Sequence, residues 1–251
     1  MTSHPARLCA VFAVSIIGVS AQAGDLTVSA ASSLTNAMRD ISPLFEAAHP
    51  GTKLQLNFGA SGALLQQIVK GAPADVFASA DQETMNQAQA NGLIKTEHRR
   101  NFVSNALVVI VPRNTAKSPT TLADLTQPGY ARIAIGLPAS APVGRYTKGV
   151  LEAAGLWGAI EPKMIGANNV RQALDYVARA EIDAGFVYAT DAALMADKVK
   201  IAFTVPTTQT ILYPVAPLSG APNSNAAAQF VDFLFTAPAQ AVLAKYGFGK
   251  P

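Results

Sequence analysis

Apolar residues along the chain follow two alternating patterns, one typical of strands and the other of amphipathic helices. Short apolar or period-two runs predict strands at residues 26–30, 53–58, 75–78, 106–111, 132–136, 184–188, 200–203 and 211–215. Apolar residues spaced three and four apart predict helices at residues 34–47, 63–70, 82–90, 144–154, 170–178, 225–235 and 238–246. Such alternation is typical of parallel sheets covered by helices, so the pattern predicts an α/β fold.

The first 23 residues have the pattern of an export signal instead. Arg7 precedes an apolar run over residues 8–19, and the A-Q-A sequence at 21–23 resembles a cleavage site. The apolar run is too short to span a membrane. Cys9 lies near the start of the run and not at its end, which argues against a lipid anchor. We therefore expect residues 1–23 to be a cleaved signal peptide.

The remaining residues are numerous enough for two small domains. The strand at 106–111 is expected to carry the chain into a second lobe, and the strand at 211–215 to return it. This organisation predicts one lobe from residues 24–104 plus 208–251, and another from residues 105–207. The two crossovers near 105 and 208 would serve as hinges. A cleft between two such lobes is a common place for a ligand.

Charge and cysteine content limit the classes of protein to which this chain can belong. The formal net charge is only +3, and no run of Lys and Arg is present, so we expect no binding to nucleic acid. The adjacent Arg99 and Arg100 fall between predicted elements and are expected in a solvated loop. The single cysteine lies in the signal segment, so the exported part is expected to fold without a disulfide.

Residue types that enzymes need are scarce after the signal segment. Only His49 and His98 remain as histidines, too few for a usual zinc site, so we expect no metal coordinated by the protein. Ser61 lies in G-A-S-G, which departs from the G-x-S-x-G hydrolase motif, and no phosphate-binding glycine loop is present. We expect Asp81 to cap a helix and Asp75 to have a structural role. No catalytic residue is predicted, although an exported hydrolase or phosphatase using an Asp and a Ser stays an alternative.

Five junctions from strand or turn to helix share small residues and a supply of hydrogen-bond donors. They lie at Ser32-Ser33, at Ser61, at residues 141–144, at residues 168–170 and at residues 188–191. Each one alone is an ordinary helix start. Because helix N-termini offer free N–H groups and a positive dipole end, five of them spread over two lobes predict a cleft for a small anion.

At these junctions the sequence resembles the periplasmic molybdate-binding proteins of ATP-driven importers. The motifs that carry the resemblance are A-A-S-S-L-T-N-A-M at 30–38, F-G-A-S-G-A-L at 58–64, G-A-P-A-D-V-F-A-S-A-D at 71–81, N-A-L-V-V-I-V-P at 105–112, A-P-V-G-R-Y at 141–146, N-V-R-Q-A-L at 169–174 and G-F-V-Y-A-T-D at 185–191. The resemblance runs through the whole exported chain. It implies a two-lobe periplasmic binding protein fold of type II, with mostly parallel sheets flanked by helices and the ligand between the lobes.

The resemblance also implies a set of ligand-binding residues. Matched position by position, these are Ser33, Ser61, Val143, Val170 and Tyr188. The serines would supply hydroxyl and amide donors, and the valines would supply main-chain N–H groups. Relatives often have alanine where Val143 stands, so the cavity is expected to be slightly narrower here. The resemblance implies no cofactor and no catalytic role.

The implied ligand is molybdate or tungstate, held as an oxyanion in the periplasm of the cell. The implied partner is a membrane permease of the ABC type, and the receptor is expected to be a monomer. Molybdate carries no proton at neutral pH, so each protein contact must be a donor. A receptor for sulfate, thiosulfate or another small oxyanion stays an alternative, as does an adhesion or scaffold domain. Arg145, Lys148 and Arg171 flank the second-lobe motifs and are expected in rim positions or structural ion pairs.

Overall fold

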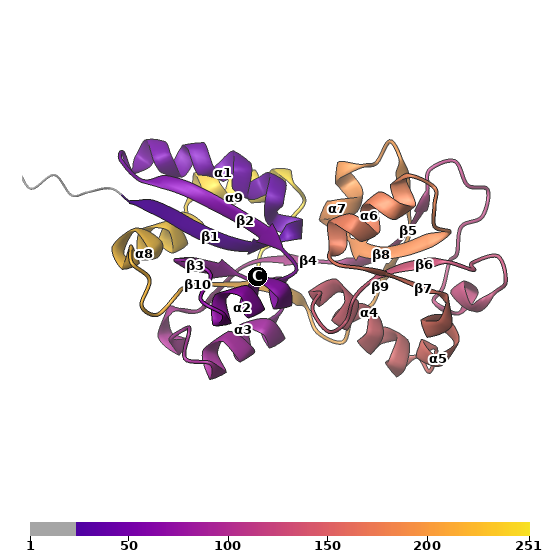
Figure 1. The fold of residues 1–251 in the computed structure, drawn as a ribbon. Helices are drawn as coiled ribbons and strands as arrows, with labels where there is room; N and C mark the ends of the chain where they lie inside the picture. The colour runs from indigo at the N-terminus through magenta and orange to yellow at the C-terminus, as the bar shows by residue number, and fades with distance from the viewer. Residues whose placement is uncertain (1–23) are drawn as a thin grey trace, which may run out of the picture.

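The computed structural model describes residues 24–251, which form two lobes side by side (Figure 1). The proposed signal peptide at 1–23 lies outside the described residues. Each lobe is built on one five-stranded sheet with helices on its faces. We call the half that holds the N-terminal strand lobe I and the other half lobe II. The predicted α/β fold with two lobes is therefore confirmed.

Lobe I contains the sheet with the strand order β2-β1-β3-β10-β4. Its strands are β1 (Asp25–Ala31), β2 (Lys53–Gly59), β3 (Val76–Ala78), β4 (Arg100–Asn105) and β10 (Ile211–Pro217). Its helices are α1 (Thr35–Ala48), α2 (Ser61–Val69), α3 (Gln82–Ala90), α8 (Ser224–Phe233) and α9 (Ala237–Lys245). Figure 1 shows α1 and α9 over one face of the sheet and α2 and α3 over the other.

Lobe II repeats this plan with the strand order β7-β6-β8-β5-β9. Its strands are β5 (Leu107–Pro112), β6 (Ile133–Gly136), β7 (Met164–Ala167), β8 (Ala184–Tyr188) and β9 (Val199–Val205). Its helices are α4 (Pro142–Ala153), α5 (Trp157–Ile160), α6 (Val170–Ala178) and α7 (Ala189–Leu194). Short 3₁₀ turns complete both lobes, among them η1 (Ser32–Leu34) directly after β1.

Both sheets are mixed in the same way. Three neighbouring strands are parallel, β2-β1-β3 in lobe I and β7-β6-β8 in lobe II. The next strand, β10 or β5, is antiparallel to both of its neighbours. The parallel strands are followed by helices whose N-termini lie at the carboxyl ends of the strands, which is where open α/β sheets bind ligands.

The chain passes between the two sheets twice. The first passage runs from the end of β4 at Asn105 to the start of β5 at Leu107, and the second from Val205 to Ile211. Figure 1 shows that these passages lie together between the lobes. Two adjacent connections of this kind allow two lobes to rotate about a common axis.

The cores explain why these segments fold as they do. Leu107–Val111 of β5 are buried on both faces, which is what a continuous apolar run in an interior strand requires. Helix α1 buries Ala37, Met38, Ile41 and Phe45, whose spacing forms one apolar stripe toward the sheet. Within residues 24–251, no single helix is long and apolar enough to cross a membrane. Helices α8 and α9 reach that composition only as a pair bent by 62°.

The prediction that Arg99 and Arg100 lie in a solvated loop is wrong. Arg100 begins strand β4, where its guanidinium pairs with Asp232 at 2.7 Å and lies 3.5 Å from the ring centroid of Phe235. Arg99 is partly buried against α3 and donates to the Gln82 side chain. The strand was missed because its sequence, R-N-F-V-S-N, has only two apolar residues, and partners distant in sequence supply the rest of its environment. Strand β7 and helix α5 were also missed, because both are only four residues long.

Candidate functional site

A small cavity lies between the lobes, at the ends of the parallel strands. Its empty volume is about 200 Å³, including the opening to solvent. Every residue that lines it is uncharged. The lining residues are Ala31, Ser32, Ser33, Gly59, Ala60, Ser61 and Ala80 from lobe I, and Ala141, Pro142, Val143, Val170 and Tyr188 from lobe II. The structure thus brings together all five residues expected to bind a ligand.

The two serines of lobe I are buried at the starts of helical segments. Ser33 lies in η1 after β1, and Ser61 is the first residue of α2 after β2. The Ser61 Oγ accepts a hydrogen bond of 3.0 Å from the main-chain N–H of Ala80. Since an N–H can only donate, the hydroxyl hydrogen of Ser61 is left to donate elsewhere. Helix α2 has no side-chain cap, and the N–H of its second residue, Gly62, donates to the Ser140 carbonyl of lobe II at 2.9 Å.

Lobe II brings two helix N-termini to the cavity. Helix α4 begins at Pro142 and has no side-chain cap, which leaves the N–H of Val143 in the uncapped first turn. At α6, the Asn169 side chain caps the N–H groups of Arg171 and Gln172. The N–H of Val170 lies outside this cap. Both termini therefore offer main-chain donors and the positive end of a helix dipole.

Tyr188 ends strand β8 and lines the cavity with an almost fully buried side chain. Its hydroxyl oxygen has no hydrogen-bond partner among the described residues. Burial raises the pKa of Tyr188 well above its ordinary range, so the hydroxyl keeps its proton at neutral pH. A buried polar atom without a partner is rare in native proteins, because it costs about 1–3 kcal/mol. This hydroxyl is consequently a strong candidate for a ligand contact.

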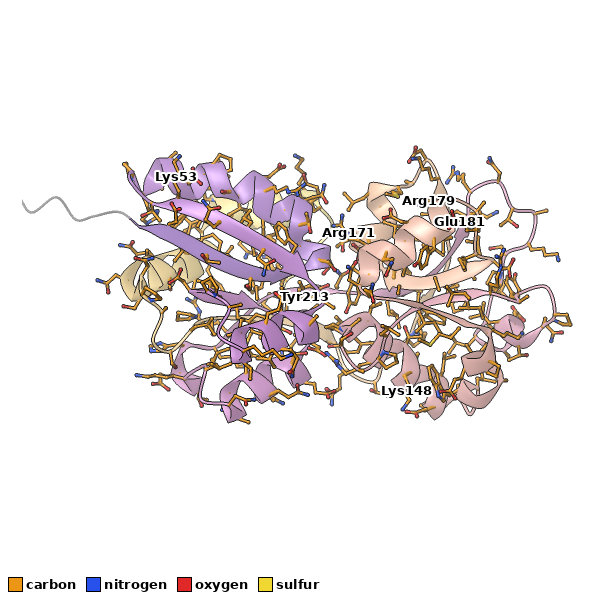
Figure 2. All side chains as sticks on the ribbon, in the orientation of Figure 1. Lys53, Lys148, Arg171, Arg179, Glu181 and Tyr213 are labelled. Atoms are coloured by element: carbon orange, nitrogen blue, oxygen red, sulfur yellow. The ribbon has the colours of Figure 1, made fainter. Side chains whose placement is uncertain are left out.

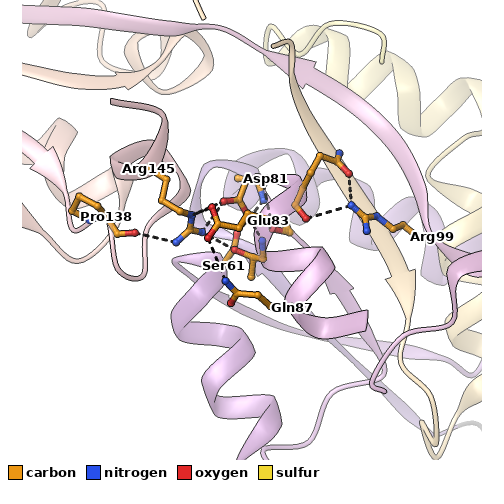
Figure 3. Close-up of polar contacts among 11 residues, drawn as sticks. Ser61, Asp81, Glu83, Gln87, Arg99, Pro138 and Arg145 are labelled. Carbon is orange, nitrogen blue, oxygen red and sulfur yellow. Dashed lines mark hydrogen bonds and ion pairs between the residues drawn. The ribbon is translucent and has the colours of Figure 1, made fainter. Parts of the chain in front are cut away.

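Arg145 lies beside the cavity without lining it and joins the two lobes (Figure 3). Its guanidinium, carried by α4, pairs with Asp81 of lobe I at 2.7 Å and donates to Thr84 Oγ1 at 2.6 Å. A third bond reaches the Pro138 carbonyl at 3.1 Å within lobe II. The other carboxylate oxygen of Asp81 accepts from the N–H of Thr84, so Asp81 is the predicted helix cap. The charge of Arg145 is thus compensated by Asp81.

Arg171 makes a second connection between the lobes (Figure 2). Carried by α6, it pairs with the fully buried Asp191 of lobe II. It also donates to Asn36 Oδ1 at 2.8 Å and to the Ser33 carbonyl at 3.1 Å, both in lobe I. Burial raises the pKa of Asp191 to about 6, and the neighbouring Arg171 opposes that rise. The contact with the Ser33 carbonyl places the Arg171 guanidinium next to the segment that carries the Ser33 hydroxyl.

Lys148 points away from the site and pairs with Glu152 one helical turn along α4, at 2.9 Å. The expected ion-pair roles of Arg145, Lys148 and Arg171 are therefore confirmed. The expected structural role of Asp75 is also confirmed, because its carboxylate accepts from the N–H groups of Thr27 and Asn223. Among residues 24–251, no group of three or more His, Cys, Asp or Glu is placed to hold a metal ion.

Some residues at the site were not predicted to take part. Ser32 lines the cavity beside Ser33. The two adjacent serines in the sequence were the signal that could have identified Ser32 as a lining residue. Tyr213, on β10, bonds to the Ser33 hydroxyl at 2.9 Å. In the sequence it is one aromatic residue in a buried strand, so nothing marked it. Its contact with Ser33 spans 180 positions and depends on the tertiary fold.

Comparison with known proteins assigns the chain to a family. Residues 26–249 match the family described as bacterial extracellular solute-binding protein. The Escherichia coli molybdate-binding protein ModA is 38% identical over 234 residues, covering 91% of this chain and 90% of that protein. The Haemophilus influenzae ModA is 31% identical over 235 residues, with 91% of each chain covered.

A solved structure agrees with this assignment. The periplasmic molybdate-binding protein of Azotobacter vinelandii superposes with a TM-score of 0.77 at 25% identity, covering 90% of this chain and 99% of that one. The likeness confirms the two-lobe type II architecture. The family and these relatives are solute-binding proteins and not enzymes. The chain therefore belongs to the family of bacterial extracellular solute-binding proteins.

Proposed function

We propose that this protein is a periplasmic receptor that captures molybdate or tungstate between its lobes and delivers it to a membrane permease of the ABC type. The observation that carries the proposal is an uncharged cavity in which both lobes present hydrogen-bond donors, with the Tyr188 hydroxyl buried and unpartnered. The names of the ModA relatives support the identity of the anion.

In this proposal the anion is held by five residues. The hydroxyl groups of Ser33, Ser61 and Tyr188 donate to its oxygens, and so do the main-chain N–H groups of Val143 and Val170. A hydrogen bond to a charged group contributes about 1.5–3 kcal/mol, so several together can bind a dianion without a counter-ion. The nearby arginines take no direct part, because Asp81 and Asp191 already compensate them.

The donor set also accounts for selection among anions. Hydrogenphosphate carries a proton that needs an acceptor, and leaving that proton unpaired costs about 1–3 kcal/mol. Sulfate carries no proton and must be rejected by size, since the molybdenum oxyanion is larger. Tungstate is nearly the same size as molybdate and should compete with it.

We further propose how capture and release work. The segments 24–104 and 208–251 move as lobe I and the segment 105–207 as lobe II, about hinges near 105 and 208. Opening would break the contacts of Arg145 with Asp81 and of Arg171 with Asn36, and closing would remake them. The receptor acts as a monomer after its signal peptide, residues 1–23, is removed on export.

An exported hydrolase is the alternative of a different class, and the positions of the histidines disfavour it. His49 stacks on Phe45 in lobe I, with ring centroids 4.3 Å apart, and His98 lies in a surface 3₁₀ turn. Neither lines the cavity, so among residues 24–251 no imidazole is placed to serve as a base for Ser33 or Ser61.

A thermal-shift panel of oxyanions, followed by calorimetry, tests the proposal. Ligand at about 1,000 times its Kd stabilises the folded state by about 4 kcal/mol. For a chain of this length we expect the melting temperature to rise by about 8–16 °C with molybdate and tungstate, and little with sulfate or phosphate. The Ser33→Ala, Ser61→Ala double variant is the control. Equal shifts with sulfate would defeat the size argument, and no shift with any oxyanion would defeat the proposed function.

A further inference from the structure

A chain of hydrogen bonds leads from the crossover between the lobes to the Ser33 hydroxyl. Asn105 lies at the end of β4, where the chain leaves lobe I. Its Nδ2 lies 3.2 Å from the Tyr213 hydroxyl oxygen, which in turn lies 2.9 Å from Ser33 Oγ. Tyr213 lies on β10 at the side of lobe I that faces lobe II (Figure 2), packs against Tyr188, and is completely buried.

The direction of each bond follows from the groups at the start of the chain. The main-chain N–H of Ala106 donates to the Asn105 side chain at 2.9 Å, which identifies that atom as Oδ1. The other side-chain atom of Asn105 is therefore the amide nitrogen. One of its hydrogens goes to Thr190 Oγ1 at 2.9 Å and the other to Tyr213. Tyr213 is thus an acceptor from Asn105.

The hydrogen of Tyr213 then has one acceptor within reach among its recorded partners. The Asn105 nitrogen cannot accept, so the remaining acceptor is Ser33 Oγ. The opposite direction, with Ser33 donating to Tyr213, would leave the Tyr213 hydrogen buried without a partner. That arrangement carries the cost of an unmade hydrogen bond and is disfavoured.

We propose that Tyr213, itself oriented by Asn105, is a positioning residue that holds the Ser33 hydroxyl as a donor toward the cavity. With Tyr213 donating to its oxygen, the Ser33 hydroxyl turns its hydrogen away from Tyr213 and toward the cavity. The N–H of Ala80 does the same for Ser61. The inference rests on the proposed function, since it takes a fully deprotonated oxyanion as the ligand.

The proposal makes Tyr213 a determinant of specificity as well as of affinity. Without the Tyr213 hydroxyl, the Ser33 hydroxyl can rotate its hydrogen away from the cavity and turn an oxygen lone pair toward the ligand. A protonated anion such as hydrogenphosphate would then find a partner for its proton. Removal of the Tyr213 hydroxyl should therefore weaken molybdate binding and reduce the preference for molybdate over phosphate.

A double-mutant cycle between Tyr213→Phe and Ser33→Ala tests the proposal, with Kd measured by calorimetry for molybdate and for inorganic phosphate. The phenylalanine keeps the ring that packs against Tyr188 and Phe248, and the melting temperature without ligand reports any loss of fold. Tyr246→Phe is the matched control, because it removes a hydroxyl bonded to Asp40 on the outer helices.

We expect Tyr213→Phe to raise the molybdate Kd about tenfold when Ser33 is present and to have almost no effect on it when Ser33 is alanine. We also expect the ratio of the phosphate Kd to the molybdate Kd to fall in Tyr213→Phe. Effects of equal size in both Ser33 backgrounds would overturn the inference while leaving the receptor function intact. Failure of the unaltered protein to bind molybdate is a different result, which would overturn the proposed function and this inference with it.

Discussion

The two lobes contribute to the cavity in different chemical ways. In the proposed site, lobe I brings the side-chain hydroxyls of Ser33 and Ser61, whereas lobe II brings the main-chain N–H groups of Val143 and Val170 and one phenol, Tyr188. A hydroxyl donor is lost when its side chain is changed. A main-chain donor is lost only when the backbone moves. The comparison teaches that the two halves of one site should respond to different kinds of substitution.

The largest effect is expected from a change that moves the backbone of lobe II. A Cβ built on Gly144 would lie 1.9 Å from the Gly136 carbonyl oxygen, so Gly144→Ala must displace the N-terminus of α4 from β6. We expect it to lower the free energy of unfolding by about 3 kcal/mol and to weaken molybdate binding. Denaturant unfolding and calorimetry measure the two effects.

Gly149→Ala is the matched control on the same helix. A Cβ there would meet no atom within 4 Å, so we expect a stabilisation of about 0.5–1 kcal/mol from the better helix former. If Gly144→Ala and Gly149→Ala had equal stability and equal affinity for molybdate, the close packing of α4 on β6 would not determine where the main-chain donors of lobe II lie.

Next in size is the loss of a lobe I hydroxyl. We expect Ser33→Ala and Ser61→Ala each to weaken molybdate binding by about 1–3 kcal/mol, because a donor to a charged ligand disappears. Ser42→Ala is a suitable control, since Ser42 lies on α1 and bonds to Glu46 away from the cavity. Calorimetric affinities that do not change in either serine variant would remove the hydroxyls from the site.

The smallest effect is expected from the side chains of lobe II. Val143→Ala and Val170→Ala keep their main-chain N–H groups, so we expect the binding free energy to change by less than about 0.5 kcal/mol. The unfolding free energy should fall by about 1 kcal/mol, because each variant leaves buried apolar surface unfilled. An affinity loss as large as that of the serine variants would contradict the assignment of main-chain donors to lobe II.

Much of the fold was predictable because local pattern and tertiary structure agree. The helices at Gln82–Ala90 and Val170–Ala178 and the strand at Ala184–Tyr188 have the predicted bounds. Strand β4 was not predictable from its own residues. Arg100 gains its surroundings from Asp232 and Phe235, which follow it by more than 130 positions.

The candidate site likewise has a part that could be predicted from the sequence and a part that could not. The five junctions carry local signals, namely small residues and hydroxyls at helix starts, and the structure brings them to one cavity. The groups behind them carry no such signal. The contact of Tyr213 with Ser33 forms only when β10 joins the sheet of lobe I, and the contacts of Arg145 with Asp81 and of Arg171 with Asn36 form only when the two lobes meet.

The central claim is that uncharged donors from both lobes hold a metal oxyanion without a counter-ion. Diffraction from crystals grown with molybdate, recorded at the molybdenum absorption edge, tests it most directly. We predict one strong anomalous peak in the cavity, with ligand oxygens at hydrogen-bond distance from the Ser33, Ser61 and Tyr188 hydroxyls and from the N–H groups of Val143 and Val170. A peak held by carboxylates or by a bound cation, or a cavity without a peak, would contradict the account.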